Sequence, residues 1–103
     1  MINAKEELLK ILMFKKPVCA YITHVPFDEK YGPISFALKK GYSQEDWEQF
    51  LTQLDFEYDN GYGTQELFGT IWMSNEVWLD RHEYDGSEYW EWQAIPEIPE
   101  ELL

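Results

Sequence analysis

Three runs in the second half of the chain constrain the fold most. Residues 67–73, 77–83 and 88–93 have the length and the β-branched and aromatic content of strands. Turn-forming segments separate them, Ser74-Asn75-Glu76 after the first run and Asp85-Gly86 after the second. Because connections this short join antiparallel neighbours, the runs predict an antiparallel meander.

The lengths of the two connections also fix which side chains share a face. One face then carries the residues that we expect in the core, which are Ile71, Met73, Val77, Leu79, Trp90 and Trp92. The other face carries Trp72, Trp78, Asp80, His82, Tyr89 and Glu91. Arg81 lies opposite Trp90 in this register, so the two side chains can form a cation–π pair.

Two capping signatures in the first half predict helices. Asn3, followed three residues later by Glu6, precedes apolar residues at helical spacing, and the chain reaches Pro17 after about three turns. Ser43 and Asp46 repeat the signature before Trp47, Phe50, Leu51 and Leu54. We therefore expect helices near residues 4–14 and 43–54.

Two further runs in the first half read as strands. Residues 18–23 form an apolar run that contains Cys19, the only cysteine, which we expect to be a buried thiol. Residues 34–38 alternate, and a turn-rich connection at 26–33 joins the two runs. Residues 95–103, which contain two prolines, should be extended. The prediction is one α+β domain, 1–103, with both helices on one face of an antiparallel sheet.

The net charge of −12 belongs to one half of the chain. Residues 1–50 hold seven Lys and seven Asp or Glu, whereas residues 51–103 hold Arg81 as the only Lys or Arg against thirteen acids. Such a half repels nucleic acid and anionic membranes and attracts basic surfaces. We expect a protein partner with a basic surface, and direct contact with neither nucleic acid nor membrane.

Catalytic and metal-binding patterns are not evident in the sequence. Cys19, His24 and His82 are scattered, so we expect no metal site and no cofactor. Asp80 and Glu91 face each other in the predicted register and could in principle catalyse glycoside hydrolysis, but chance pairs arise easily in a chain with twenty acids. We expect no enzymatic activity. The apolar runs are far shorter than the roughly 20 residues that cross a bilayer, and the first residues lack the order of a signal peptide, so we expect a cytoplasmic protein.

The candidate binding surface mixes exposed aromatic rings with carboxylates. We assign to it Asp59, Tyr62, Trp72, Trp78, Asp80, Asp85, Glu88, Tyr89 and Glu91. Trp and Tyr are the usual anchors of protein interfaces, and carboxylates along a strand pair can lie where the phosphates of a nucleic acid would lie. A solvated face with a few packed rings is the alternative interpretation of the same residues.

Four segments of the second half form a further recognisable pattern: Asp55-Phe56-Glu57-Tyr58-Asp59, Leu67-Phe68-Gly69-Thr70-Ile71-Trp72, Asp85-Gly86-Ser87-Glu88-Tyr89-Trp90 and Ile95-Pro96-Glu97-Ile98-Pro99. In these segments the chain resembles a class of short proteins of tailed bacteriophages. The resemblance implies a context, since small acidic phage proteins often inhibit nucleic-acid-binding machinery of the host, including restriction and CRISPR enzymes.

The expected function is therefore a non-enzymatic accessory protein that occupies a basic, nucleic-acid-binding surface of a host protein in the host cytoplasm. A small carbohydrate-binding or hydrolytic domain that uses Trp and carboxylates is one alternative. A structural or assembly protein that forms a homodimer through a sheet edge is another.

Overall fold

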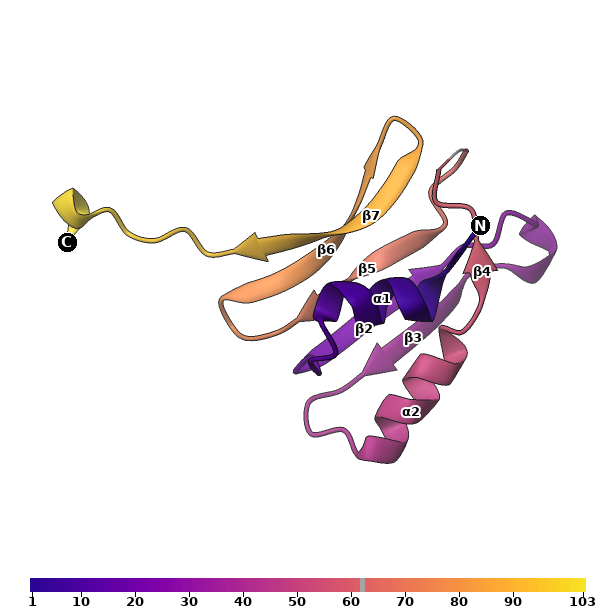
Figure 1. The fold of residues 1–103 in the computed structure, drawn as a ribbon, viewed down its shortest axis with the longest axis horizontal. Helices are drawn as coiled ribbons and strands as arrows, with labels where there is room; N and C mark the ends of the chain where they lie inside the picture. The colour runs from indigo at the N-terminus through magenta and orange to yellow at the C-terminus, as the bar shows by residue number, and fades with distance from the viewer. Residues whose placement is uncertain (62) are drawn as a thin grey trace.

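A five-stranded antiparallel sheet forms the body of the molecule in the computed structural model, which describes residues 1–61 and 63–103 (Figure 1). The order of its strands is β3-β2-β5-β6-β7. Their bounds are β2 (Cys19–His24), β3 (Ile34–Leu38), β5 (Leu67–Trp72), β6 (Val77–Tyr84) and β7 (Ser87–Ala94). The sheet thus contains the predicted meander, and the two N-terminal strands extend it on one side.

The predicted register of the meander is confirmed. Ile71 pairs with Leu79, and Trp72 with Trp78, across β5 and β6. Arg81 pairs with Trp90 across β6 and β7, and its guanidinium carbon lies 5.1 Å from the centroid of the Trp90 ring. Short connections and strict alternation leave no other register that buries the apolar set.

Both helices begin at their predicted caps. Asn3 accepts a hydrogen bond from the Glu6 N–H at the start of α1 (Ala4–Leu12), and Ser43 and Asp46 form a complete capping box at the start of α2 (Gln44–Gln53). However, α1 ends at Leu12, because Met13 and Phe14 take left-handed backbone conformations with φ of 53° and 62°. Pro17 therefore plays no direct part in ending it.

The core lies between the helices and one face of the sheet. Its members from α1 and α2 include Leu8, Leu12, Trp47 and Phe50, all buried. The facing sheet residues are Ala20, Ile22, Phe36, Leu38, Leu67, Ile71, Leu79 and Trp90. The α+β architecture with two helices on one sheet face is therefore the one that the sequence predicts.

Three details differ from the sequence-based expectation. Trp92 shares the core face but is 44% exposed, because the helices do not cover that end of β7. Cys19 pairs with Trp72 on the opposite face and is only partly buried. A short 3-10 helix, η2 (Glu100–Leu102), interrupts the extended C-terminal tail, as another, η1 (Glu29–Tyr31), interrupts the 26–33 connection.

A two-stranded ladder was not expected from the sequence. It pairs β1 (Ile2–Asn3) with β4 (Glu57–Tyr58) in antiparallel fashion. The Ala4 N–H donates to the Phe56 carbonyl beside it. This ladder ties the start of α1 to the segment that follows α2, and it holds Tyr58 in the core.

Candidate protein-binding surface

The face of the sheet that points away from the core carries the candidate surface. We call it the open sheet face and define it by Tyr21, Phe68, Trp72, Trp78, Asp80, His82, Tyr89 and Glu91. Tyr21 pairs with Thr70 and Phe68 pairs with Thr23 across β2 and β5, so these side chains also point to this face. Among the described residues, both helices pack on the other side of the sheet.

Aromatic rings on this face are accessible to a partner. Tyr21 is 50% exposed, Phe68 41%, Trp72 39% and Tyr89 41%, while Trp78 is partly buried. These residues come from four strands, so the rings are spread across the sheet and backed by a rigid ladder. Half-exposed rings on a rigid support are suited to protein contacts, since they lose little conformational entropy on binding.

Asp80 fixes the position of one of these rings. Its Oδ2 accepts a hydrogen bond of 3.0 Å from the Trp78 indole N–H, and its Oδ1 accepts one of 2.9 Å from the Thr70 hydroxyl. Both oxygens therefore have partners within the protein. Asp80 orients the Trp78 ring and still contributes a negative charge to the face.

Glu91 and His82 form the other polar pair of the face. Glu91 Oε2 lies 3.3 Å from His82 Nε2, and both side chains are about half exposed. The His82 ring also lies near the Tyr89 ring, with centroids 6.0 Å apart. A basic partner would meet the Glu91 carboxylate directly at this exposed pair.

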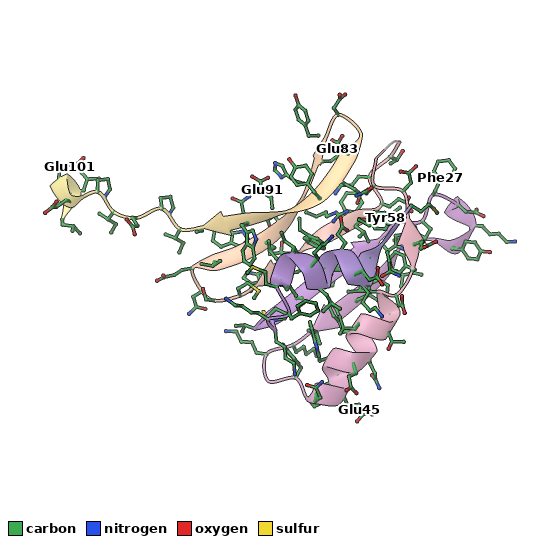
Figure 2. All side chains as sticks on the ribbon, viewed as in Figure 1. Phe27, Glu45, Tyr58, Glu83, Glu91 and Glu101 are labelled. Carbon is green, nitrogen blue, oxygen red and sulfur yellow. The ribbon has the colours of Figure 1, made fainter. Side chains whose placement is uncertain are left out.

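Further exposed acids lie beyond the face. Glu83 and Asp85 are at the tip of the β6–β7 hairpin, where Glu83 accepts a hydrogen bond from the Gly86 N–H at 2.8 Å. Glu97, Glu100 and Glu101 lie on the C-terminal tail. Figure 2 shows Glu83 at the hairpin and Glu101 at the end of the tail, far from each other, so the negative charge is spread along the molecule.

The expected exposed position of Glu88 is wrong. Glu88 is only 3% exposed and lies on the core side of β7, where its Oε1 accepts bonds from Arg81 Nε at 3.1 Å and Nη2 at 2.9 Å. The same carboxylate accepts the backbone N–H groups of Glu66 and Leu67. Four hydrogen bonds compensate its desolvation, so Glu88 is a structural residue.

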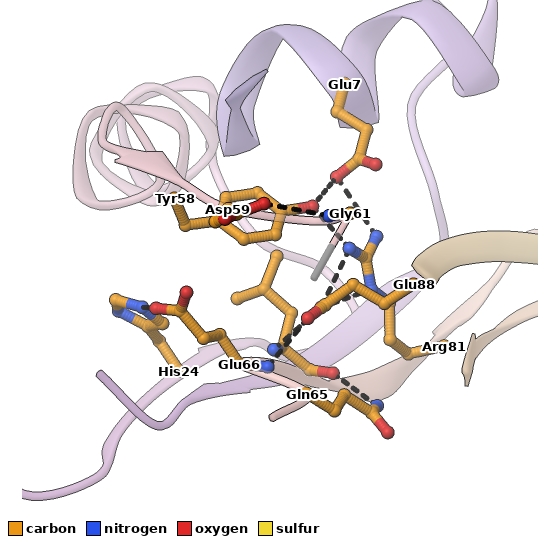
Figure 3. A network of polar contacts seen from close by, with 10 residues as sticks. Glu7, His24, Tyr58, Asp59, Gly61, Gln65, Glu66, Arg81 and Glu88 are labelled. Atoms are coloured by element: carbon orange, nitrogen blue, oxygen red, sulfur yellow. Dashed lines mark hydrogen bonds and ion pairs between the residues drawn. The ribbon is translucent and has the colours of Figure 1, made fainter. Parts of the chain in front are cut away.

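Arg81 is the centre of this buried network, which Figure 3 shows from close by. Its Nη1 donates to Glu7 of α1 at 3.0 Å, and its Nη2 also donates to the Tyr58 hydroxyl. The Tyr58 hydroxyl in turn donates to Glu7, and burial raises the pKa of this phenol. The one Lys or Arg of residues 51–103 is thereby withdrawn from the surface, so no lysine or arginine of that half faces a partner.

Asp59, another predicted site residue, does not lie on the open sheet face. Asp59 lies in the loop after β4 and accepts a hydrogen bond from the Gly61 N–H at 2.9 Å. That loop follows the core residue Tyr58, and its Asn60 carbonyl accepts the Glu88 N–H at 2.9 Å. Asp59 therefore lies beside the buried network (Figure 3). Tyr62 lies outside the described residues.

Sequence reasoning missed Tyr21 and Phe68. Both occur in predicted strands, next to the buried residues Ala20, Ile22 and Leu67. Because side chains alternate along a strand, burial of these neighbours predicts that Tyr21 and Phe68 point to the opposite face. Within residues 1–61 and 63–103, no group of three or more His, Cys, Asp or Glu is placed to hold a metal ion. Neither described helix is long and apolar enough to cross a membrane.

Comparison with known proteins finds no counterpart: no family model, curated protein or solved structure matches the chain.

Proposed function

We propose that this protein binds a basic, nucleic-acid-binding surface of a host protein through its open sheet face and thereby inhibits that protein. One observation carries the proposal. The open sheet face combines half-exposed aromatic rings with carboxylates, and the five strands of the sheet contain no lysine and one arginine, which is buried. A surface of this kind attracts a positively charged partner and offers it rigid rings to pack against.

The acids and the aromatic rings of this surface contribute to binding in different ways. Acids at the hairpin tip and on the open sheet face, such as Asp85 and Glu91, raise the rate of encounter with a basic surface, and salt screens this effect. The rings of Trp72, Trp78 and Tyr89 exclude water from the contact and slow dissociation. A partner that normally neutralises phosphates would meet carboxylates instead, and binding of its nucleic acid would be blocked. The acidic composition and the phage-like sequence of the second half support this context.

The carbohydrate alternative has less support from the geometry. Asp80, the acid nearest to a Trp of the face, uses both oxygens on Trp78 and Thr70. The hollow that Trp72 helps to line measures about 260 Å³, and Lys40, rather than a carboxylate, is its charged member among the described residues. The rings are spread over a broad face, which suits a protein surface better than a sugar ring.

The test begins with capture of a partner from host lysate and measurement of its association and dissociation rates at low and high salt. Replacing Asp85 by Asn together with Glu91 by Gln should slow association and reduce its dependence on salt. Trp72→Ala should mainly accelerate dissociation, by about tenfold. The matched control is Glu45→Gln with Glu48→Gln, which removes two exposed acids from α2 on the far side of the sheet.

The control pair should leave both rates within about twofold of the unmodified protein, apart from the small loss of long-range attraction. Binding that responds equally to the α2 control and to the open-face pair would reject the assignment of the surface. Binding that ignores salt, the acids and Trp72 would reject the proposed function and favour the assembly alternative.

A further inference from the structure

A groove runs along α1 and shares only Tyr89 with the open sheet face. It consists of two hollows, of about 590 and 270 Å³, which share Ile2, Glu7 and Lys10 and therefore adjoin. The larger hollow is also lined by Glu6, Leu9, Met13 and Phe14. The smaller one continues past Ile11 to the edge of the sheet at Tyr89 and Trp90. We call the two together the α1 groove.

Two large apolar side chains stand exposed at one end of the α1 groove. Met13 is 71% exposed and Phe14 83% exposed, and both residues have a positive φ, which costs free energy for residues other than glycine. A glycine in place of Met13 would end α1 without this strain. Exposed apolar side chains at the end of a groove are typical of surfaces that bind a partner.

Trp90 lines the smaller hollow and carries a polar group without a partner among the described residues. The Trp90 indole N–H is buried, and no acceptor is found for it among the described residues. The indole ring gives this end of the groove an aromatic wall against which a proline-containing segment can pack.

The C-terminal tail, residues 95–103, has the properties that this groove requires. It leaves β7 and projects away from the body of the molecule (Figure 1). Its apolar residues are exposed, with Ile95 at 56%, Ile98 at 64% and Leu102 at 72%. Pro96 and Pro99 frame Glu97 and Ile98, and Pro99 has φ −58° and ψ 146°, the polyproline II conformation that aromatic-lined grooves bind with little loss of entropy.

The charges of the tail and of the α1 groove are complementary. Glu97, Glu100 and Glu101 accompany the apolar residues of the tail, whereas Lys10 lines the groove and Lys15 follows its Phe14 end. The acids of the groove do not cancel this match. Glu7 is bound to Arg81, and Glu6 lies one turn before Lys10, so the lysines lie toward the Phe14 end of the groove.

We infer that the tail of one copy docks into the α1 groove of a second copy, with Ile98 against Phe14 and the tail acids against Lys10 and its neighbours. The tail does not reach its own groove in the structure, because it is anchored at Ile95, whose N–H donates to the Glu76 carbonyl, and prolines keep it extended from there. The exchange can be reciprocal in a dimer or can continue as a chain of copies.

The test is sedimentation equilibrium of the full chain over a wide concentration range, at low and high salt. The unmodified protein should self-associate, more strongly at low salt. Phe14→Ser in the groove and Ile98→Ser in the tail should each weaken association by at least about tenfold. Phe27→Ser is the matched control, because Phe27 is 84% exposed but lies in the 26–33 connection, and it should leave association unchanged.

A charge exchange distinguishes docking between copies from docking within one. Lys10→Glu and Glu97→Lys should each weaken self-association, and a mixture of these two variants should associate better than either alone, since the altered groove then meets the altered tail. A protein that stays monomeric at every concentration overturns the inference, whether its tail is free or bound to its own groove. Association that survives both Phe14→Ser and Ile98→Ser overturns it as well.

Discussion

Replacing Arg81 by Met should be among the most damaging single changes in this chain. The side chain of Arg81 is fully buried, and its guanidinium binds Glu88 at 2.9 Å and Glu7 at 3.0 Å. Methionine fills a similar volume but removes the only positive charge of the network. The Glu88 carboxylate, with a 2% exposed side chain, would then be a buried charge held only by two backbone N–H groups.

The magnitude follows from breaking a buried ion pair on one side, which costs about 3 to 5 kcal/mol. That is a large part of the roughly 5 to 15 kcal/mol by which a domain of this size is stable. The free energy of unfolding would be measured by urea denaturation, monitored by tryptophan fluorescence. Lys5→Met is the matched control, because Lys5 forms a 3.3 Å ion pair with Asp55 at the surface and its loss should cost less than about 1 kcal/mol.

A double-mutant cycle tests the physical reasoning behind this prediction. Arg81→Met combined with Glu88→Met removes both charges, so the double variant should lose less stability than the sum of the two single variants. The cost that remains comes from the Glu66 and Leu67 N–H groups, which lose their acceptor. If Arg81→Met costs no more than Lys5→Met, the buried network does not hold the fold together.

Three further predictions concern the fold. Gly69→Ala should destabilise the protein by about 2 kcal/mol or more in urea denaturation. Gly69 has φ 149°, and an added Cβ would lie 2.2 Å from the Tyr21 carbonyl oxygen. A smaller loss of stability would mean that the sheet relaxes around the methyl group. Phe50→Ala should cost about 3 to 5 kcal/mol, since Phe50 is 1% exposed, whereas a loss under about 1 kcal/mol would place this face of α2 in solvent. Burial raises the pKa of Tyr58, so this phenol ionises in the unfolded chain first as the pH rises above about 10. The stability that Tyr58 contributes below that pH therefore declines in alkali. Tyr58→Phe should flatten this decline of the unfolding free energy with pH, and an unchanged decline would contradict the burial of the Tyr58 hydroxyl.

Local signals predicted most of the fold. The β5–β6–β7 meander follows from two short connections and from alternation, and a shift by one residue would expose Ile71 and Leu79. The capping box of Ser43 and Asp46 predicted the start of α2 because it satisfies orphan N–H groups through neighbours in the sequence. The two-residue strands β1 and β4 carry no periodic signal, and they pair residues more than fifty positions apart.

The candidate site was predicted less completely. Glu88 was assigned to the surface because acids are usually solvated. However, Glu88 pairs with Glu83 across β6 and β7, and this pair lies on the same face of the sheet as Arg81 and Trp90. The predicted register therefore already placed Glu88 on the core side. The contact between Arg81 and Glu7 spans 74 residues and could not be read from either segment alone. Asp80 was assigned to the binding surface, but its role in orienting Trp78 depends on the side-chain geometry across β5 and β6.

Competition for a partner tests the central claim most directly. A captured partner would be mixed with labelled duplex nucleic acid that it binds, and this protein would be added while anisotropy reports the bound label. Occupation of the nucleic-acid-binding surface predicts that the label is released in full as the protein is added, and that the Trp72→Ala variant requires a higher concentration to release it. A stable ternary complex, in which the label stays bound while the protein is also bound, would contradict the claim.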